Sequence, residues 1–281
     1  LNYGSINSAP GSLLNVLVNS AAVTLAAGSN ISANQVTVTA QGPVNIFGTI
    51  TGVGSNPLVN ILAGVFNLYG AIAVNPSTGN GGRVIVTSSK VTLSAGSRIE
   101  VNGLTDGGEV TVTANGTGEV NSQGYVQANG GTGRGGTITF TDTQTILIQN
   151  ATLQANGNDG GQITLSSYSG DINIQNSLIQ TNGSTGRGGS IGISGANSTI
   201  LVASTINAQG WSQGGTILIG NDAKNGTLPF SLVLSLDAQT SINASQIDIS
   251  NLTSGGFVET SGHTLNLLAT INAGRGGKHR I

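Results

Sequence analysis

Six short stretches with the same pattern decide the fold: GGRVIV (81–86), GGEVTV (107–112), GGTITF (135–140), GGQITL (160–165), GGSIGI (188–193) and GGTILI (214–219). Each begins with a glycine pair and continues as an alternation in which every second residue is apolar, which is typical of a strand with one buried side. The copies follow one another at a nearly constant interval. This interval indicates a repeat architecture in which each copy contributes one equivalent strand.

A second marker has the same period. It reads IEVNG (99–103), VQANG (126–130), LQANG (153–157), IQTNG (179–183) and INAQG (206–210). Between the two markers lies a third apolar pair, which successive repeats fill with Val91/Leu93, Ile146/Ile148, Ile172/Ile174 and Ile200/Val202. Each repeat therefore predicts three short strands separated by turns.

The apolar side of such a repeat can be buried only if the repeats stack. Each strand then pairs with its equivalent in the next repeat, about 4.8 Å away, and the apolar side chains form continuous inner columns. The sequence therefore predicts an all-β fold, a right-handed parallel β-helix of about 11 coils, each of roughly 26 residues with three short strands. Besides the apolar pairs above, the predicted inward residues are Val84, Val86, Val110, Val112, Ile138, Phe140, Ile163, Leu165, Ile191, Ile193, Ile217, Ile219, Ile99, Val126, Leu153, Ile179 and Ile206.

We expect a single β-helix domain over residues 1–281, with four parts of different regularity. Residues 1–80 form less regular coils without the glycine pairs, and residues 81–220 form the regular Gly-Gly repeats. Residues 221–254 are predicted to be a coil with a loop insertion, because the interval from Gly214 to Gly255 is much longer than the regular period. Residues 255–281 are predicted to form the final coils, with an open end.

The composition excludes several classes of site and partner. Because the chain has no Cys, it has neither a disulfide nor a thiolate metal site. A net charge of −2 without a basic run argues against nucleic acid as the partner. Catalytic β-helices need clustered carboxylates, but the 11 acidic residues are scattered, and the two histidines, His263 and His279, lack metal-ligand spacing. We therefore expect no cofactor, no metal ion and no enzymatic activity.

Polar residues precede the glycine pairs in every regular repeat. In order they are Asn80, Asp106, Arg134, Asp159, Arg187 and Gln213. If the coils stack in register, the four charged residues form a ladder of alternating sign, in which each exposed contact contributes at most about 1 kcal/mol. The alternative is that turns before glycine simply prefer polar residues.

A second polar column consists of the asparagines in the Asn-Gly turns, which are Asn102, Asn129, Asn156 and Asn182. Asparagine tolerates the left-handed conformation and glycine adopts positive φ, which suffices to explain the dipeptide. Stacked side-chain amides can also form hydrogen bonds along the rod axis. We expect these asparagines to have a structural role, because an amide is neither a nucleophile nor a titrating group.

Three further features could bind or carry a ligand. Trp211 follows INAQG in a turn, where an exposed indole could stack on a sugar. Thr and Ser at outward positions of the first strands, such as Thr111 and Thr139, resemble the flat arrays of ice-binding solenoids, although Arg83, Ile85, Gly192 and Leu218 interrupt the array. Asn-x-Ser/Thr sequons, which are candidate glycosylation sites, occur at Asn30, Asn115, Asn150, Asn182, Asn197, Asn225, Asn243 and Asn251.

The repeats near the end of the chain resemble a known family. GGTILIGND (214–222), Ile242-Asn243-Ala244 and GGFVETSGH (255–263) resemble phrases of the large adhesins that bacteria export by two-partner secretion, of the filamentous haemagglutinin and high-molecular-weight adhesin type. LVNILAGVFNLYGAIAVN (58–75) and GNGGRVIV (79–86) are similar to coils just beyond the secretion domain of that family. The secretion domain itself, with its NPNG-like turns, is not recognisable in this sequence.

The resemblance implies a secreted protein at the surface of a Gram-negative bacterium, exported by an outer-membrane transporter partner. Together with the repeats, it predicts a non-catalytic extracellular rod that serves adhesion or scaffolding, including in biofilms. Its expected ligand is a polysaccharide or another component of a host or neighbouring cell surface, and open strand edges predict end-to-end self-association into a filament. The alternatives are a carbohydrate-active β-helix enzyme, a lyase or hydrolase, and an ice- or sugar-binding solenoid.

Overall fold

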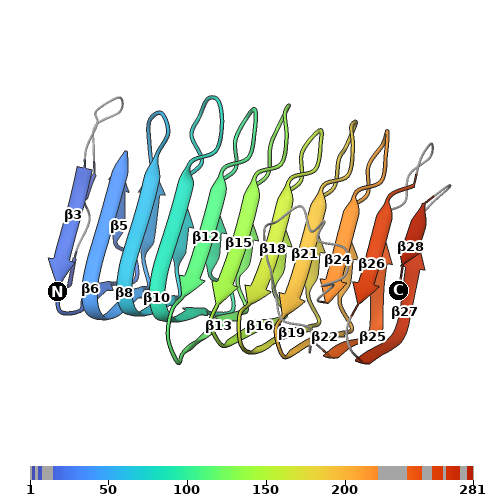
Figure 1. Ribbon diagram of the computed structural model, residues 1–281. Coiled ribbons are helices and arrows are strands. Elements are labelled where there is room, and N and C mark those ends of the chain that lie inside the picture. The colour runs from blue at the N-terminus through green and yellow to red at the C-terminus, as the bar shows by residue number, and fades with distance from the viewer. Residues whose placement is uncertain are drawn as a thin grey trace.

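The computed structural model describes residues 2–3, 6–7, 15–220, 239–248, 255–261, 264–272 and 277–280. Its strands form one sheet of 28 strands that winds into a parallel stack (Figure 1). Three ladders of strands run along the stack, one for each side of the coil, and we name them the first, second and third faces. Across the described residues there is no helix long and apolar enough to cross a membrane.

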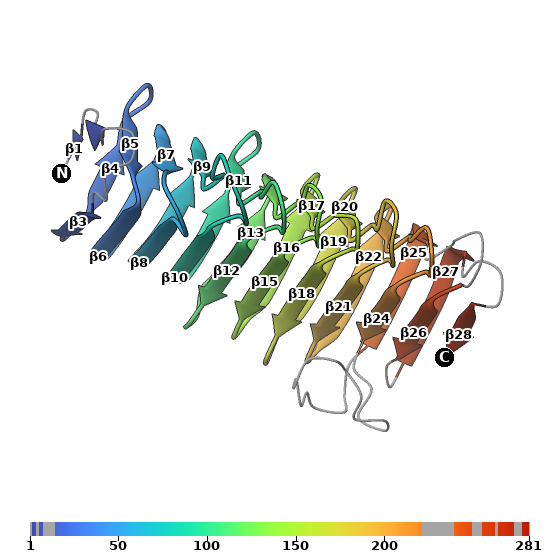
Figure 2. The same cartoon turned by 90° about the horizontal axis from the view of Figure 1, so that it is seen from above.

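The first face carries the strands that follow the glycine pairs. Each strand pairs in parallel with the equivalent strand of the next coil, as Figure 2 also shows. In order along the stack, these strands are β3 (Asn15–Ser20), β6 (Gln35–Ile46), β8 (Leu58–Leu68), β10 (Arg83–Leu93), β12 (Glu109–Ala114), β15 (Thr137–Asp142), β18 (Gln162–Ser167), β21 (Ser190–Gly195), β24 (Thr216–Gly220), β26 (Phe257–Ser261) and β28 (Lys278–Arg280).

The second and third faces complete each coil. The long strands β6, β8 and β10 turn the first corner without a break and continue on the second face. The other second-face strands are β4 (Val23–Leu25), β13 (Glu119–Ser122), β16 (Thr145–Gln149), β19 (Asp171–Gln175) and β22 (Ser198–Val202). The third face contains β5 (Asn30–Ala33), β7 (Thr49–Gly52), β9 (Ala71–Ala73), β11 (Arg98–Glu100), β14 (Tyr125–Gln127), β17 (Thr152–Gln154), β20 (Leu178–Gln180) and β23 (Thr205–Asn207). Strands β25 (Gln239–Asp248) and β27 (Thr264–Asn272) span both faces, and β1 (Asn2–Tyr3) and β2 (Ile6–Asn7) pair with β4 and β5.

The predicted all-β parallel solenoid with three strands per coil is confirmed, but the number of coils is lower than expected. About eight turns follow one another without a gap, from β3 to β23, instead of the larger number predicted. Dividing the chain length by the repeat overestimates the count, because the interval from Gly214 to Gly255 is much longer than the regular period but adds one turn, β24 with β25. Of the predicted insertion at 221–254, only β25 lies within the described residues.

The core is a set of apolar columns, one for each inward position of the three faces. On the first face, one column passes through Val86, Val112, Phe140 and Leu165, all fully buried. The burial pattern alternates strictly along β12 and β15, as the period-2 pattern predicts. Every predicted inward residue is buried except the pair Ile200 and Val202.

The prediction that Ile200 and Val202 point inward is wrong. In β22, Thr199 and Leu201 are fully buried instead, and they pair with Ile172 and Ile174 of the coil before. The cause is the first corner, which has three residues between Ser167 and Asp171 but two between Gly195 and Ser198. A one-residue difference in a strand reverses which side chains face the core. The buried Thr199 hydroxyl is satisfied because it accepts a hydrogen bond from the Gly195 N–H, at 2.9 Å.

The glycines are needed for close backbone packing rather than for positive φ. A Cβ on Gly136 would lie 2.0 Å from the carbonyl oxygen of Gly108 in the preceding coil. In the Asn-Gly turns, a Cβ on Gly130 would lie 2.0 Å from the carbonyl oxygen of Arg134. Neither glycine has a positive φ, so the explanation of the Asn-Gly turns by left-handed backbone is wrong. The corner where the third face meets the first is too crowded for any side chain at these positions.

Left-handed residues do occur, at the corner between the second and third faces. Asn150, Asn176 and Ala203 follow the second-face strand in three successive coils and have φ values of 52°, 49° and 50°. Asparagine adopts this conformation at little cost, whereas alanine does so at a cost of about 1 kcal/mol. Ala203 therefore holds a strained backbone at a position where the two preceding coils have asparagine.

We expect Ala203→Asn to raise the free energy of unfolding by about 1 kcal/mol, because it relieves this strain without changing a core contact. Urea unfolding followed by circular dichroism measures the change. The reverse substitution in the coil two turns earlier, Asn150→Ala, is the matched control and should lower stability by a similar amount. A loss of stability in Ala203→Asn would contradict the assignment of strain.

Candidate functional site

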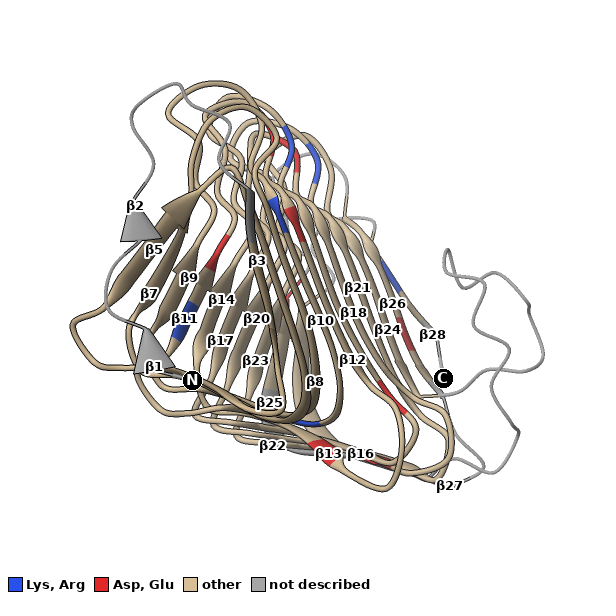
Figure 3. Ribbon diagram, turned by 90° about the vertical axis from the view of Figure 1, so that its left-hand side faces the viewer, with Lys and Arg blue, Asp and Glu red and all other residues tan. Residues whose placement is uncertain are grey.

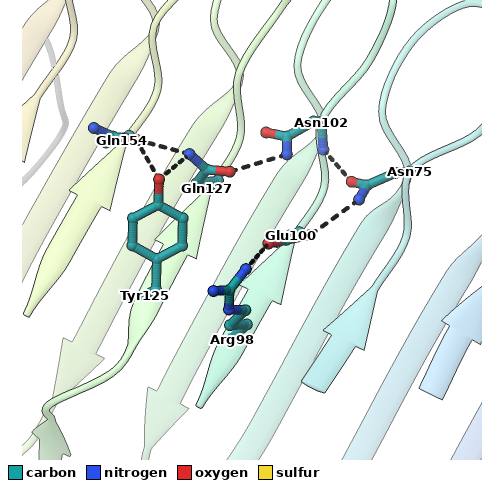
Figure 4. Close-up of polar contacts among 7 residues, drawn as sticks. All are labelled: Asn75, Arg98, Glu100, Asn102, Tyr125, Gln127 and Gln154. Atoms are coloured by element: carbon teal, nitrogen blue, oxygen red, sulfur yellow. Dashed lines mark hydrogen bonds and ion pairs between the residues drawn. The ribbon is translucent and has the colours of Figure 1, made fainter. Parts of the chain in front are cut away.

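The third face carries a column of side-chain amides on its outward side (Figure 4). Gln127, Gln154 and Gln180 occupy the same position in β14, β17 and β20. The Gln127 Nε2 donates to Gln154 Oε1 at 2.7 Å, and the Gln154 Nε2 donates to Gln180 Oε1 at 2.9 Å. Glu100 precedes this column in β11, and Asn207 follows it in β23. Each of these bonds holds an amide in one orientation along the rod.

The predicted asparagine column lies beside these glutamines, at the corner where the third face ends. The Oδ1 atoms of Asn102, Asn129 and Asn156 each accept a hydrogen bond from the backbone N–H of the next asparagine in the column, at 2.7–2.8 Å. Asn182 Oδ1 accepts one from the Gln209 N–H at 2.9 Å, and Asn75 Oδ1 accepts one from the Asn102 N–H. The contacts run from side chain to backbone, and the Asn102 Nδ2 also donates to Gln127 Oε1 at 3.1 Å, which joins the two columns.

A groove opens at the start of the third-face strands, next to the two columns. Its volume is about 470 Å³, and its lining includes Arg98, Tyr125, Asn150 and Thr152. The Arg98 guanidinium lies 5.9 Å from the centre of the Tyr125 ring and 3.5 Å from a carboxylate oxygen of Glu100. Although paired, the Arg98 side chain remains 62% exposed. The groove therefore combines an aromatic ring with an accessible cation, and the amide column lies beside it.

Two details of this groove indicate what it can bind. The Tyr125 hydroxyl donates to Gln154 Oε1 at 2.9 Å and also contacts Gln127 Nε2, so the ring is anchored to the glutamine column. The Ser97 Oγ lies in the lining, is buried and has no hydrogen-bond partner among the described residues. Fixed amides, an aromatic surface and an arginine match a ligand rich in hydroxyl groups, and none of these groups is a nucleophile paired with a base.

The predicted charge column is stacked at the corner before the glycine pairs, but its contacts differ from those expected. Asp106 Oδ1 accepts a hydrogen bond from the Arg134 backbone N–H, and Asp159 Oδ1 accepts one from the Arg187 backbone N–H, both at 2.8 Å. Ion pairs form at other places, among them Arg83–Glu109, Lys90–Glu119 and Arg98–Glu100. Figure 3, seen along the stack, shows charged residues scattered around the coil. That this column fixes the register between coils stays a prediction.

Asp142 is a polar residue of the core that the sequence interpretation missed. It ends β15, is fully buried, and stands in line with Ala114 and Ser167 of the neighbouring coils. Its carboxylate accepts hydrogen bonds from the backbone N–H of Val120 at 2.8 Å and of Gln144 at 2.9 Å, so it caps the first corner. Burial raises the pKa of Asp142 above 3.8; these hydrogen bonds oppose the shift and the nearby Glu119 adds to it.

A raised pKa of Asp142 means that this carboxyl group binds its proton more tightly in the folded protein than in the unfolded chain. The contribution of Asp142 to stability is therefore largest below pH 3.8 and falls as the pH rises through the folded-state pKa. Asp142→Asn removes the titrating group and also gives up one of the two accepted hydrogen bonds, so we expect the stability of the variant relative to the parent to rise as the pH rises through the folded-state pKa of Asp142. Thermal unfolding across this pH range measures the difference. A variant whose stability relative to the parent falls with rising pH would contradict the account.

Trp211 and the threonine array show different degrees of exposure. The Trp211 side chain is 61% exposed at the corner after Gly210, and Leu104 stands at the corresponding position four coils earlier. Thr111 and Thr139 are half-buried neighbours in β12 and β15. In the next coils, Thr164, Ser166 and Ser194 are buried. Along these coils the array is therefore half-buried or buried, which leaves little surface for ordered water.

The eight sequons fall into groups of different accessibility. Asn115, Asn150 and Asn197 are exposed, whereas Asn30 and Asn182 are half-buried. The Asn182 side chain also belongs to the asparagine column, so a sugar on it would disturb that column. The strand β25 contains Asn243, while Asn225 and Asn251 lie outside the described residues.

No group of three His, Cys, Asp or Glu side chains among the described residues could hold a metal ion. His279 Nε2 lies 3.1 Å from the Thr260 Oγ1, and burial lowers the pKa of the imidazole. His263 lies outside the described residues.

Comparison with known proteins found a similar solved structure. No protein-family model matches the chain, and no curated protein matches it. The chain is similar to the crystal structure of the HMW1 secretion domain from Haemophilus influenzae. The two are 15% identical, the alignment covers 95% of this chain and 93% of that one, and the TM-score is 0.37.

Proposed function

We propose that this chain forms a non-catalytic extracellular rod that binds polysaccharide along its third face. The observation that carries the proposal is the fixed amide column beside the Arg98–Tyr125 groove. Amides held in one orientation can exchange hydrogen bonds with sugar hydroxyls without first losing conformational freedom. The tyrosine ring offers a surface for the apolar side of a sugar ring.

The repeat of the coil makes the binding multivalent. Gln127, Gln154 and Gln180 present the same group on successive strands, about 4.8 Å apart, so a long polymer could contact several coils at once. Linked weak contacts give a higher total affinity than any single contact. Such binding suits adhesion to a cell surface or to matrix polysaccharide, including in a biofilm.

Binding assays on a panel of polysaccharides test this proposal. Pectin, alginate, a glycosaminoglycan and dextran would be immobilised, and binding of the purified protein measured. We expect Tyr125→Ala to weaken binding to the recognised polymer by about tenfold, the loss of one aromatic contact. Arg98→Ala should also weaken it. Tyr168→Ala removes a tyrosine that is more exposed than the half-buried Tyr125 and lies at a different corner, and it is the control. Equal loss in Tyr125→Ala and Tyr168→Ala would contradict the location.

Trp211 remains a second proposed sugar contact, because its indole is the most exposed aromatic ring of the described residues. In the same assay, Trp211→Ala separates the two locations. A large loss for Trp211→Ala with no loss for Tyr125→Ala would move the site from the third face to the corner after Gly210.

Export and assembly complete the proposal. The resemblance to two-partner secretion adhesins supports secretion to the cell surface through an outer-membrane transporter. End-to-end association into a filament would extend the parallel ladders from one copy to the next. Electron microscopy separates the two states: isolated rods on the order of 50 Å long for single copies, and long fibres with a matching axial repeat for a filament.

A further inference from the structure

We infer that Asn115 is a site of spontaneous deamidation. The backbone nitrogen of Gly116 attacks the side-chain amide carbon of Asn115, and ammonia leaves. Asn-Gly dipeptides are prone to this reaction because glycine has no side chain to hinder the attack. Within the described residues they begin at Asn80, Asn102, Asn115, Asn129, Asn156 and Asn182. The structure separates Asn115 from all the others.

Four of the other dipeptides belong to the asparagine column, and both reacting groups in each are held. The side-chain oxygen of Asn129, for example, accepts a hydrogen bond from the Asn156 N–H at 2.8 Å. The Gly130 N–H, the nitrogen that would attack, donates to the Asn156 carbonyl oxygen at 2.8 Å. The equivalent glycine N–H groups of the column donate in the same way to the next coil. The attack requires these ladder contacts to open first.

Asn80 is held in a similar way by the next coil, although it stands before a glycine pair. Its Oδ1 accepts a hydrogen bond from the Asp106 backbone N–H at 3.3 Å. The Gly81 N–H donates to the Asp106 carbonyl oxygen at 2.8 Å. Both groups that would react at Asn80 are therefore restrained as well.

Asn115 lies in the turn between β12 and β13, where its own backbone N–H donates to the Ser88 carbonyl oxygen of the preceding coil at 2.8 Å. Its side chain is exposed, and among the described residues no hydrogen bond holds its amide. Gly116 has a φ of 139°, and a Cβ there would come no closer than 3.5 Å to another atom. The Gly116 N–H donates to the Thr143 Oγ1 at 3.1 Å, and the same hydroxyl donates to the Gly116 carbonyl oxygen at 2.6 Å. A single threonine therefore restrains the attacking nitrogen.

The reaction needs neither an oxidant nor an enzyme. The Gly116 nitrogen loses its proton and forms a bond to Cγ of Asn115, and the bond from Cγ to the side-chain nitrogen breaks as ammonia leaves. Water then adds to one of the two carbonyl carbons of the cyclic imide. Opening gives aspartate or isoaspartate, and either product adds one negative charge to a chain of formal net charge −2.

Peptide mapping by mass spectrometry tests the inference. The purified full chain would be incubated at mildly alkaline pH, where the nitrogen is deprotonated more often, and amide loss followed at each Asn-Gly peptide. We expect Asn115 to convert more than about tenfold faster than the five other asparagines, because each of those must first lose two hydrogen bonds. In denaturant, all of them should convert at similar rates. Equal rates in the folded protein would overturn the inference.

A variant of the restraining residue gives an independent check. Thr143→Val removes the hydroxyl and keeps the shape of the side chain, so we expect conversion of Asn115 to accelerate while the other Asn-Gly sites remain unchanged. Asn115→Gln should abolish the fast reaction, because the longer side chain closes a less favourable ring. Thr143→Val without any acceleration would show that the exposed turn is held by another contact and would overturn this assignment.

Discussion

Ile172→Asp should destabilise the protein by about 4 kcal/mol or more, the largest loss that we expect from a single core substitution. Ile172 is fully buried in the second-face column between Ile146 and Thr199. A carboxylate there has no partner in a thin core and cannot turn to solvent without breaking the ladder. Chemical unfolding followed by circular dichroism measures the effect.

The matched control for this substitution is Asn173→Asp, on the next residue of the same strand. Asn173 is half-buried on the outward side, so the new charge can be solvated and the loss should stay below about 1 kcal/mol. If Ile172→Asp cost no more than Asn173→Asp, the assignment of inward and outward sides on the second face would be wrong.

Gly136→Ala should cost about 3 kcal/mol or prevent folding, although it adds a single methyl group. The new Cβ would lie 2.0 Å from the carbonyl oxygen of Gly108 and 2.7 Å from the carbonyl carbon of Gly107. Both contacts are with backbone, which can move only if the coils separate. Gly136 N–H also donates to the Ala128 carbonyl oxygen at 2.6 Å, so the shift would weaken the corner itself.

Gly79→Ala is the control that separates close packing from backbone conformation. Gly79 has a φ of 78° and open space around it, so alanine there should cost only about 1 kcal/mol of conformational strain. If Gly136→Ala and Gly79→Ala lost similar amounts of stability, close contact between coils would not be the reason for glycine at these pairs.

The fold could be predicted because it depends on local alternation repeated at a fixed interval. The glycine pairs mark the start of each first-face strand, and the residues after them, such as Val110 and Ile138, are buried as the period-2 pattern requires. The reason for those glycines could not be predicted, because the crowding around Gly136 comes from the backbone of the preceding coil. In β22, Thr199 faces the core instead of Ile200 because of the length of the corner before the strand. The alternation of apolar and polar residues alone does not specify that length.

Much of the candidate site also escaped the sequence interpretation. Glutamine stands at the same place in VQANG, LQANG and IQTNG, and this repetition was a signal for the amide column. Turn chemistry explains an Asn-Gly pair and so predicts a role for the neighbouring asparagines, whereas a single glutamine in a strand indicates only a side that faces solvent. Arg98 and Tyr125 come from different coils, and no spacing rule within one repeat joins them. The sequence does not predict the burial of Asp142, because that burial follows from the corner and not from the neighbouring residues in sequence.

The most direct test of the central claim is to incubate the protein with the polysaccharide that it binds and to measure complex formation and polymer length together by light scattering after size separation. A rod that binds without cutting predicts a complex of protein and polymer, and an unchanged polymer length after prolonged incubation. Progressive shortening of the polymer would contradict the proposal and favour the carbohydrate-active enzyme. Failure to form a complex with any polymer of the panel would contradict the assignment of the third face as a polysaccharide-binding surface.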